Sequence, residues 1–148
     1  MYQNILVAVD GSHTSDIALH EAIKIARELH GRLRIVNAVE TVYFNLDGEF
    51  IDPTEVWEAM RKNGQAILAR ALASVQEAGI EAETRLVDID TLGQRIPQVL
   101  ADEAETWPAD LIIVGTHGRR GISHLFLGSI AEGVARVATK PVLLVRGE

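Results

Sequence analysis

The sequence predicts an α/β protein with an open five-stranded parallel sheet and helices on both faces. Short apolar runs alternate with helical stripes from one end of the chain to the other, which favours strand–helix–strand units joined by right-handed crossovers. The first run, ILVAV at 5–9, is apolar at every position, as is typical of a strand buried on both faces. No repeat, low-complexity tract or linker interrupts the pattern. We therefore expect one domain covering 1–148.

The first half of the chain begins with this strand at 5–9, which DGSHTS at 10–15 ends with turn and capping residues. Ser12, Thr14 and Ser15 are expected to cap the helix that follows. The apolar face of that helix consists of Ile17, Ala18, Ala22, Ile25, Ala26 and Leu29. Gly31 is its expected C-cap. A second strand is predicted at 33–39, and a polar and aromatic loop at 41–52.

The second helix has a recognisable start at Asp52-Pro53-Thr54-Glu55. Asp52 suits the N-cap, Pro53 suits the first helical position, and Glu55 can complete a capping box. Its inward-facing residues are predicted to be Val56, Met60, Ile67, Ala71 and Val75. Gly64 is expected to weaken its middle by roughly 1 kcal/mol relative to alanine, and Gly79 is expected to stop it.

The second half of the chain continues the alternation. The segment 80–87 alternates apolar and polar residues, which predicts a strand near an edge of the sheet. Strands four and five are predicted at 109–115 and 141–145. The third helix is marked by Ile96, Val99, Leu100 and Ala104, and the fourth by Ile130, Ala131, Val134, Val137 and Ala138.

Composition excludes several classes of protein. The formal net charge of −7 and the pI of about 5.2 oppose general binding to nucleic acid or to anionic lipid. The chain has no cysteine, which removes disulfides, thiolate metal sites and a cysteine nucleophile. No apolar run reaches the ~20 residues of a membrane helix, and the first ten residues do not resemble a signal peptide. We expect a cytoplasmic protein that does not bind membranes.

The stretch GTHGRRGISHLFLGSIAEGV at 115–134 carries the main functional signal. A strand ends near Gly115 and the helical stripe resumes only near Gly128, whereas such connections usually take 2–6 residues. Ligands of doubly wound sheets bind outside the carboxyl ends of the strands, where this connection begins. The stretch lacks the lysine of a Walker loop and the spacing of the Gly-x-Gly-x-x-Gly fingerprint.

The glycines of this stretch predict a phosphate-binding loop. Gly115, Gly118 and Gly128 permit positive φ and close approach of a ligand to backbone N–H groups. The start of the fourth helix adds unpaired N–H groups and a positive dipole end. Ser129 Oγ can donate to a phosphate oxygen, and Arg119 or the neighbouring arginine can add positive charge. The alternative reading is a flexible, glycine-rich surface turn.

Three blocks of the sequence resemble the universal stress protein family. Gly115-x2-Gly118-x9-Gly128-Ser129 matches its G-2x-G-9x-G-[ST] nucleotide motif, while 5–12 and 140–145 match its opening and closing blocks. The similarity covers essentially the whole chain and implies a flavodoxin- or Rossmann-like sheet. Family members that carry the motif bind ATP, whereas those similar to the founding bacterial protein lack it. The resemblance therefore implies the ATP-binding branch.

The resemblance also implies contact residues. The adenine and ribose are implied to lie against Ala8, Val9, Asp10, Ala38, Val114 and Gly115. The phosphates are implied to lie against Gly118, Gly128, Ser129 and Ile130, with Arg119 as an added contact. Asp10 would bond a sugar hydroxyl, although it also suits a turn or cap before Ser12. The chain departs from the family at Val87-Asp88-Ile89-Asp90, where a Gly-x-Pro-like turn is usual.

Metal-binding alternatives have less support in the sequence. Asp88 and Asp90 would share one face of an extended segment, which permits a metal pair, but two acids in a loop usually mean only solvation. The histidines show no recognised ligand spacing. We expect no metal ligands and no catalytic residues, since a phosphate cradle is present without a convincing general base.

The function implied is that of an ATP-dependent stress-response regulator or sensor. The ligand would be ATP, with or without Mg²⁺, or a related adenine nucleotide, and the protein partner is unidentified. One alternative is a slow ATPase or phosphotransferase that uses the same loop, and another is an interaction module without a ligand. The apolar final strand has only Arg146 to guard its edge, which predicts pairing with a second copy. The resemblance likewise implies a homodimer through Val142–Val145.

Overall fold

The computed structural model describes residues 2–41, 53–117 and 127–147. It confirms the predicted α/β class, with five parallel strands in one sheet. The elements in chain order are β1 (Asn4–Ala8), α1 (His13–Leu29), β2 (Arg32–Thr41), α2 (Pro53–Glu77), β3 (Ala82–Asp90), α3 (Ile96–Thr106), β4 (Leu111–Gly115), α4 (Ser129–Val137) and β5 (Val142–Val145).

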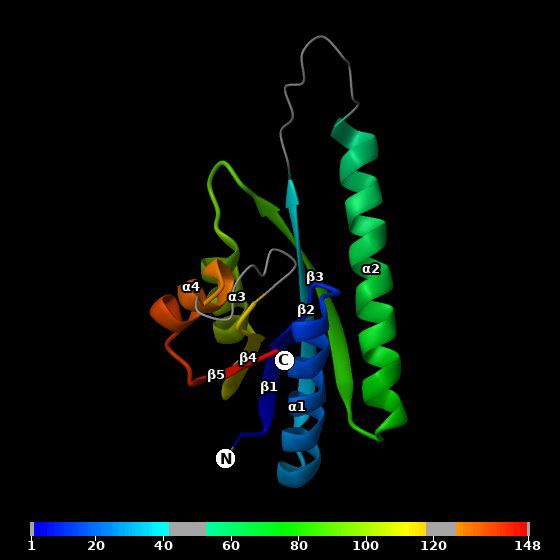
Figure 1. Cartoon of the computed structure of the whole chain (residues 1–148), viewed down its shortest axis with the longest axis vertical. Helices are drawn as coiled ribbons and strands as arrows, with labels where there is room; N and C mark the ends of the chain where they lie inside the picture. Colours follow the sequence, from blue (N-terminus) through cyan, green and yellow to red (C-terminus); the bar gives the residue numbers. More distant parts are fainter. Residues whose placement is uncertain (1, 42–52, 118–126, 148) are drawn as a thin grey trace.

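The strand order in the sheet is β3-β2-β1-β4-β5 (Figure 1). β1 therefore lies at the centre, and the direction in which strands are added reverses between β1 and β4. This order equals that of the first five strands of the Rossmann sheet. The reversal creates a switch point at the carboxyl ends of β1 and β4, which is where open α/β sheets bind ligands.

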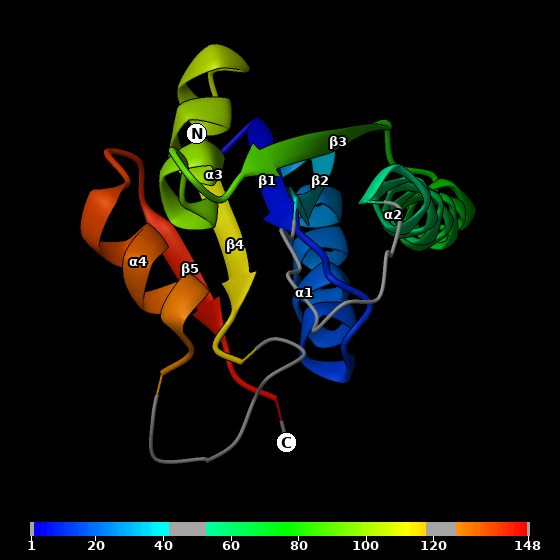
Figure 2. The same ribbon diagram turned by 90° about the horizontal axis from the view of Figure 1, so that it is seen from above.

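Helices cover both faces of the sheet, as predicted. α1 and α2 lie on one face, and α3 and α4 on the other (Figure 2). Alternation along β1 supplies both cores, because Ile5 and Val7 belong to the first and Leu6 to the second. All three side chains are fully buried, as expected for a central parallel strand. Within the described ranges, no helix is both long and apolar enough to cross a bilayer.

The prediction for the end of α1 is wrong in one detail. The left-handed residue is His30, with φ 54°, and Gly31 instead donates its N–H to Ala26 O at 2.9 Å. A Cβ on Gly31 would lie 3.0 Å from the carbonyl oxygens of Tyr2 and Gln3. Glycine is therefore needed at this position for close backbone approach rather than for positive φ.

The boundaries of α2 agree with the prediction where they can be compared. The helix begins at Pro53 and ends at Glu77, two residues before Gly79, whose φ is 76°. The expected capping residue, Asp52, lies outside the described residues.

The third strand is longer than predicted. It covers Ala82–Asp90 rather than 80–87, and its pairing with β2 continues to Thr41↔Asp90. The segment 87–90, which was expected to form a loop, is therefore strand. β3 lies at the edge of the sheet, as its alternating pattern predicted.

Candidate functional site

The predicted adenosine contacts lie near the carboxyl ends of three neighbouring strands. Ala8 ends β1, Val114 and Gly115 end β4, and Ala38 lies in β2 two residues beyond Val36, the partner of Ala8. Val9 continues the pairing past β1, since its N–H donates to Val36 O at 2.9 Å. The fold thus gathers these residues at the switch point.

A buried asparagine, which the sequence interpretation did not single out, fixes the end of β1. Asn37 of β2 is 4% exposed, and its Nδ2 donates to Val9 O at 2.9 Å. On its other side, a Cβ on Gly64 of α2 would lie 2.6 Å from Asn37 Oδ1. The signal in the sequence was an amide inside the apolar run 33–39, because a polar group there needs a specific partner.

Asp10 lies in the turn between β1 and α1. One carboxylate oxygen accepts the N–H of Ser12 at 2.9 Å, and the Asp10 N–H donates to Ser15 Oγ at 3.3 Å. Ser12 is the N-cap of α1, with its Oγ accepting the Ser15 N–H at 3.2 Å. The turn interpretation of Asp10 is therefore realised, and its contact with a sugar hydroxyl stays a prediction.

Thr14 does not cap α1 as expected. It lies within the first turn of the helix, and its side chain contacts the end of β4 instead. A Cβ on Gly115 would lie 2.7 Å from Thr14 Cγ2. The small size of Gly115 therefore lets α1 and β4 approach closely at the switch point.

The fourth helix begins where the glycine-serine pair predicted. Gly128 is the N-cap of α4, and Ser129, which is exposed, is the first helical residue. The first N–H groups of a helix have no partner within it, so those of Ser129 and Ile130 head a positively polarised end. The Gly128 N–H is already used, because it donates to Thr116 O at 2.6 Å.

The positive φ predicted for the glycines at 115 and 128 is wrong, whereas the close approach of a ligand to their N–H groups stays a prediction. Gly128 has φ −63°, and Gly115 is part of β4, so neither adopts positive φ. A Cβ on Gly128 would lie 2.8 Å from Thr116 O, which explains the glycine by contact. Thr116 is buried, and its Oγ1 lies 3.0 Å from His117 Nδ1. The other two predicted phosphate contacts, Gly118 and Arg119, lie outside the described residues.

The acidic pair at the end of β3 has local partners. Asp88 forms an ion pair with Arg61 of α2, and Asp90 Oδ1 accepts the Leu92 N–H at 3.1 Å. In the ranges that the structure describes, no group of three or more His, Asp or Glu side chains is placed to hold a metal ion.

The matched blocks of sequence, together with this fold, point to one family. The model of the universal stress protein family matches residues 1–146. This chain belongs to the universal stress protein family. A putative universal stress protein of Staphylococcus aureus (strain USA300) is 33% identical to it over 152 residues, which cover 99% of this chain and 86% of the relative.

Solved structures of family members have the same fold. A universal stress protein of Burkholderia pseudomallei is 34% identical and superposes with a TM-score of 0.79, covering 97% of this chain and 95% of that one. Two others were solved with adenine nucleotides. One, in complex with cAMP, is 30% identical with a TM-score of 0.69 and covers 98% and 97% of the two chains. The other, from Archaeoglobus fulgidus in complex with dAMP, is 25% identical with a TM-score of 0.67 and covers 97% and 98%.

Proposed function

We propose that this universal stress protein belongs to the ATP-binding branch of its family and acts as a nucleotide-dependent stress-response regulator or sensor in the cytoplasm. The observation that supports this most is that the N-terminus of α4 and both ends of the glycine-rich nucleotide motif lie at the switch point of the sheet. The polarised start of α4 is hydrogen-bonded to Thr116, directly after β4, which neighbours β1 in the sheet, and the complete G-2x-G-9x-G-S motif leads into it. Relatives solved with cAMP and dAMP support an adenine nucleotide as the ligand.

The adenosine part would lie across the ends of β1, β2 and β4. The half-buried residues Ala8 and Ala38 would offer backbone groups and small apolar surfaces to the adenine. Asp10 would accept a hydrogen bond from a ribose hydroxyl. Its turn is held by Ser12 and Ser15, so the carboxylate needs little reorganisation on binding.

The phosphates would lie against the start of α4. The backbone N–H groups of Ser129 and Ile130, together with Ser129 Oγ, would donate to phosphate oxygens, and the helix dipole would favour the negative charge. Gly118 and Arg119 complete the proposed set. Mg²⁺ would arrive as the companion of the triphosphate.

A calorimetric titration with ATP tests this function. We expect wild-type protein to bind one ATP per chain, and Ser129→Val to weaken binding at least tenfold, because a valine removes the hydroxyl donor and crowds the phosphates. Ser129 is exposed, so the fold should survive, which circular dichroism checks. Ser74→Val is the matched control, since Ser74 is an exposed helical serine on α2. Equal affinities for wild type and Ser129→Val would reject the assignment.

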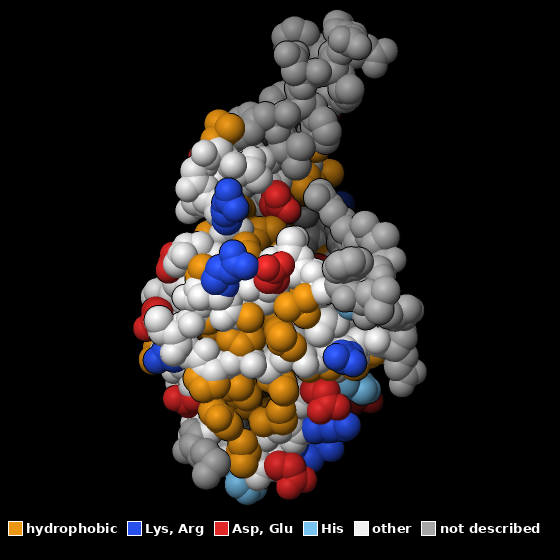
Figure 3. Space-filling view, turned by 60° about the vertical axis from the view of Figure 1, so that its left-hand side comes forward, with side chains coloured by type: hydrophobic (Ala, Val, Ile, Leu, Met, Phe, Trp, Pro, Cys, Tyr) orange, Lys and Arg blue, Asp and Glu red, His pale blue; other side chains and the backbone are white. Residues whose placement is uncertain are grey.

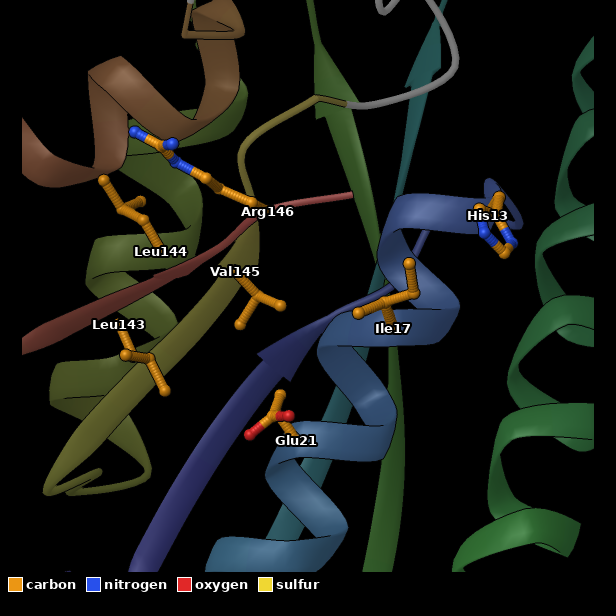
Figure 4. Close-up of a pocket in the computed structure, with 7 residues that line it drawn as sticks. All are labelled: His13, Ile17, Glu21, Leu143, Leu144, Val145 and Arg146. Atoms are coloured by element: carbon orange, nitrogen blue, oxygen red, sulfur yellow. The ribbon is translucent and has the colours of Figure 1, made fainter. Parts of the chain in front are cut away.

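The same proposal includes a homodimer through β5. This strand ends the sheet, and its first three residues are only half-buried although all are apolar. Hydrophobic side chains gather on the side of the molecule that carries α4 and β5 (Figure 3). A groove separates β5 from α1, and Ile17 and Glu21 face Val145 across it (Figure 4). A second β5, related by a two-fold axis, would pair with this edge and cover its apolar residues.

A further inference from the structure

The side chain of Thr14 separates two backbone segments that are distant in sequence. A Cβ on Gly115, at the end of β4, would lie 2.7 Å from Thr14 Cγ2. A Cβ on Gly147, two residues after β5, would lie 2.4 Å from Thr14 Oγ1. The two branches of one threonine are thus each in contact with a glycine, and neither glycine has room for a methyl group.

Hydrogen bonds connect the same segments to the start of α4. The Thr116 N–H donates to Val145 O, the last residue of β5, at 2.8 Å. The Thr116 carbonyl accepts the Gly128 N–H at 2.6 Å. The end of β5, the end of β4 and the N-cap of α4 therefore form one continuous set of contacts, with Thr14 packed against its first two members.

We propose that Thr14 is a positioning residue through which the segment after β5 sets the affinity of the nucleotide site. This inference rests on the proposed function and adds a means of regulating it. Packed interiors do not deform continuously, so a shift at Gly147 moves Thr14 and then Gly115, which lies beside the ribose in the proposed complex. Coupling is reciprocal, so a bound nucleotide also restrains the segment after β5, next to the edge proposed for dimerisation.

A mutant cycle on the full chain, read by calorimetric titration with ATP, tests the coupling. Gly147→Ala places a methyl group against Thr14 Oγ1, and we expect a loss of affinity of about tenfold, within the usual range of coupling between sites. Thr14→Ala alone should change the affinity by no more than about threefold. The double variant Thr14→Ala/Gly147→Ala should match Thr14→Ala, because the truncated side chain leaves room for the methyl group.

The matched control for this rescue is Thr14→Val/Gly147→Ala. Valine loses the hydroxyl but keeps a carbon in its place, so binding should stay as weak as in Gly147→Ala. Gly93→Ala controls for the glycine change itself, since its Cβ would meet no atom within 4 Å. Melting temperatures of all variants control for general destabilisation, and the titrations are run at a temperature at which every variant is fully folded.

The possible outcomes separate the two proposals. Wild-type protein that does not bind ATP would overturn the proposed function and this inference with it. Wild-type binding with an unchanged Gly147→Ala affinity, or with equal rescue by alanine and valine at position 14, would overturn only the inference. Should Gly147→Ala not fold, hydrogen exchange on wild type and Thr14→Ala replaces it. ATP should then slow exchange of the amides at 145–147 in wild type but not in Thr14→Ala, and equal slowing in both would contradict the coupling.

Discussion

At the scale of single residues, Gly64 shows why a glycine can persist in the middle of a helix. This glycine lies on the side of α2 that packs against the sheet. A Cβ on it would lie 2.6 Å from Asn37 Oδ1 and 2.8 Å from Leu86 Cδ1. The lower helix propensity of glycine is thus offset by the close approach of α2 to β2 and β3. Because Asn37 also bonds Val9, this packing extends to the end of β1 beside the proposed site.

Gly64→Ala should therefore destabilise the protein despite the higher helix propensity of alanine. We expect the free energy of unfolding, measured by urea denaturation, to fall by about 1–3 kcal/mol, as is usual for overpacked cores. The comparison is Gly93→Ala, where the added methyl group meets open space and the change should stay within about 0.5 kcal/mol. A more stable Gly64→Ala protein would show that propensity outweighs packing here.

Sequence patterns predicted where the elements around the proposed site begin and end better than they predicted why particular residues occur there. The Gly128-Ser129 pair correctly located the start of α4, yet Gly115 and Gly128 have close contacts with Thr14 and Thr116 in place of the predicted positive φ. Contacts between segments distant in the chain have no local signature. For the same reason the sequence did not predict that Asn37 contacts Val9 or that Gly147 contacts Thr14.

At the scale of elements, Glu103 of α3 binds two strands of the sheet through one charged hydrogen bond and one ion pair. Its carboxylate lies 2.7 Å from Arg34 Nη1 of β2 and 3.4 Å from Arg85 Nε of β3. The side chains of Glu103 and Arg34 are only 11% and 18% exposed, so solvent screens this pair weakly. Arg34 also lies over the ring of Trp107, 5.1 Å from its centroid. These interactions hold α3 against β2 and β3.

Glu103→Ala leaves Arg34 with the Trp107 ring and, among the carboxylates that the structure describes, with the more exposed Glu83. We expect the free energy of unfolding to fall by about 1.5–3 kcal/mol, which is typical of hydrogen bonds to charged groups. Glu83→Ala is the matched control. Its side chain is 50% exposed, so its loss should cost at most about 1 kcal/mol. Equal losses in the two variants, measured by denaturant unfolding, would contradict the importance of burial.

The order and class of the elements could be predicted because hydrophobic periodicity is local. The boundaries were less predictable, as β3 demonstrates. Its last residues, Asp88 and Asp90, are polar and indicate a loop, but pairing with β2 keeps the segment extended and buries Ile89 between them. The extended conformation of this segment thus depends on pairing with β2, which the residues of the segment itself do not indicate.

At the scale of the whole molecule, the direction of backbone groups along β5 bears on the proposed dimer. The carbonyls of Pro141 and Val145 accept the N–H groups of Ile112 in β4 and of Thr116 directly after it. Alternation along the strand therefore turns the N–H of Leu144 outward, towards the free edge of the sheet. A second β5 would bond to these outward groups. The edge strand therefore offers a test that separates backbone pairing from side-chain packing.

Leu144→Pro should produce a monomer in sedimentation equilibrium, because proline removes the outward N–H while leaving the bonds to β4 in place. Leu144→Ala removes the same side chain but keeps the N–H, and it should remain largely dimeric. If both variants, or neither, are monomeric while wild type is a dimer, the pairing through β5 is not the interface that we propose.

The central claim is that the carboxyl ends of β1 and β4, together with the start of α4, hold an adenine nucleotide. Calorimetric titration of ATP into the wild-type protein, repeated with Ser129→Val, tests it most directly. We predict saturable binding of one ATP per chain and at least a tenfold loss in the variant. Absence of saturable binding to the folded wild type, or binding that Ser129→Val leaves unchanged, would contradict it.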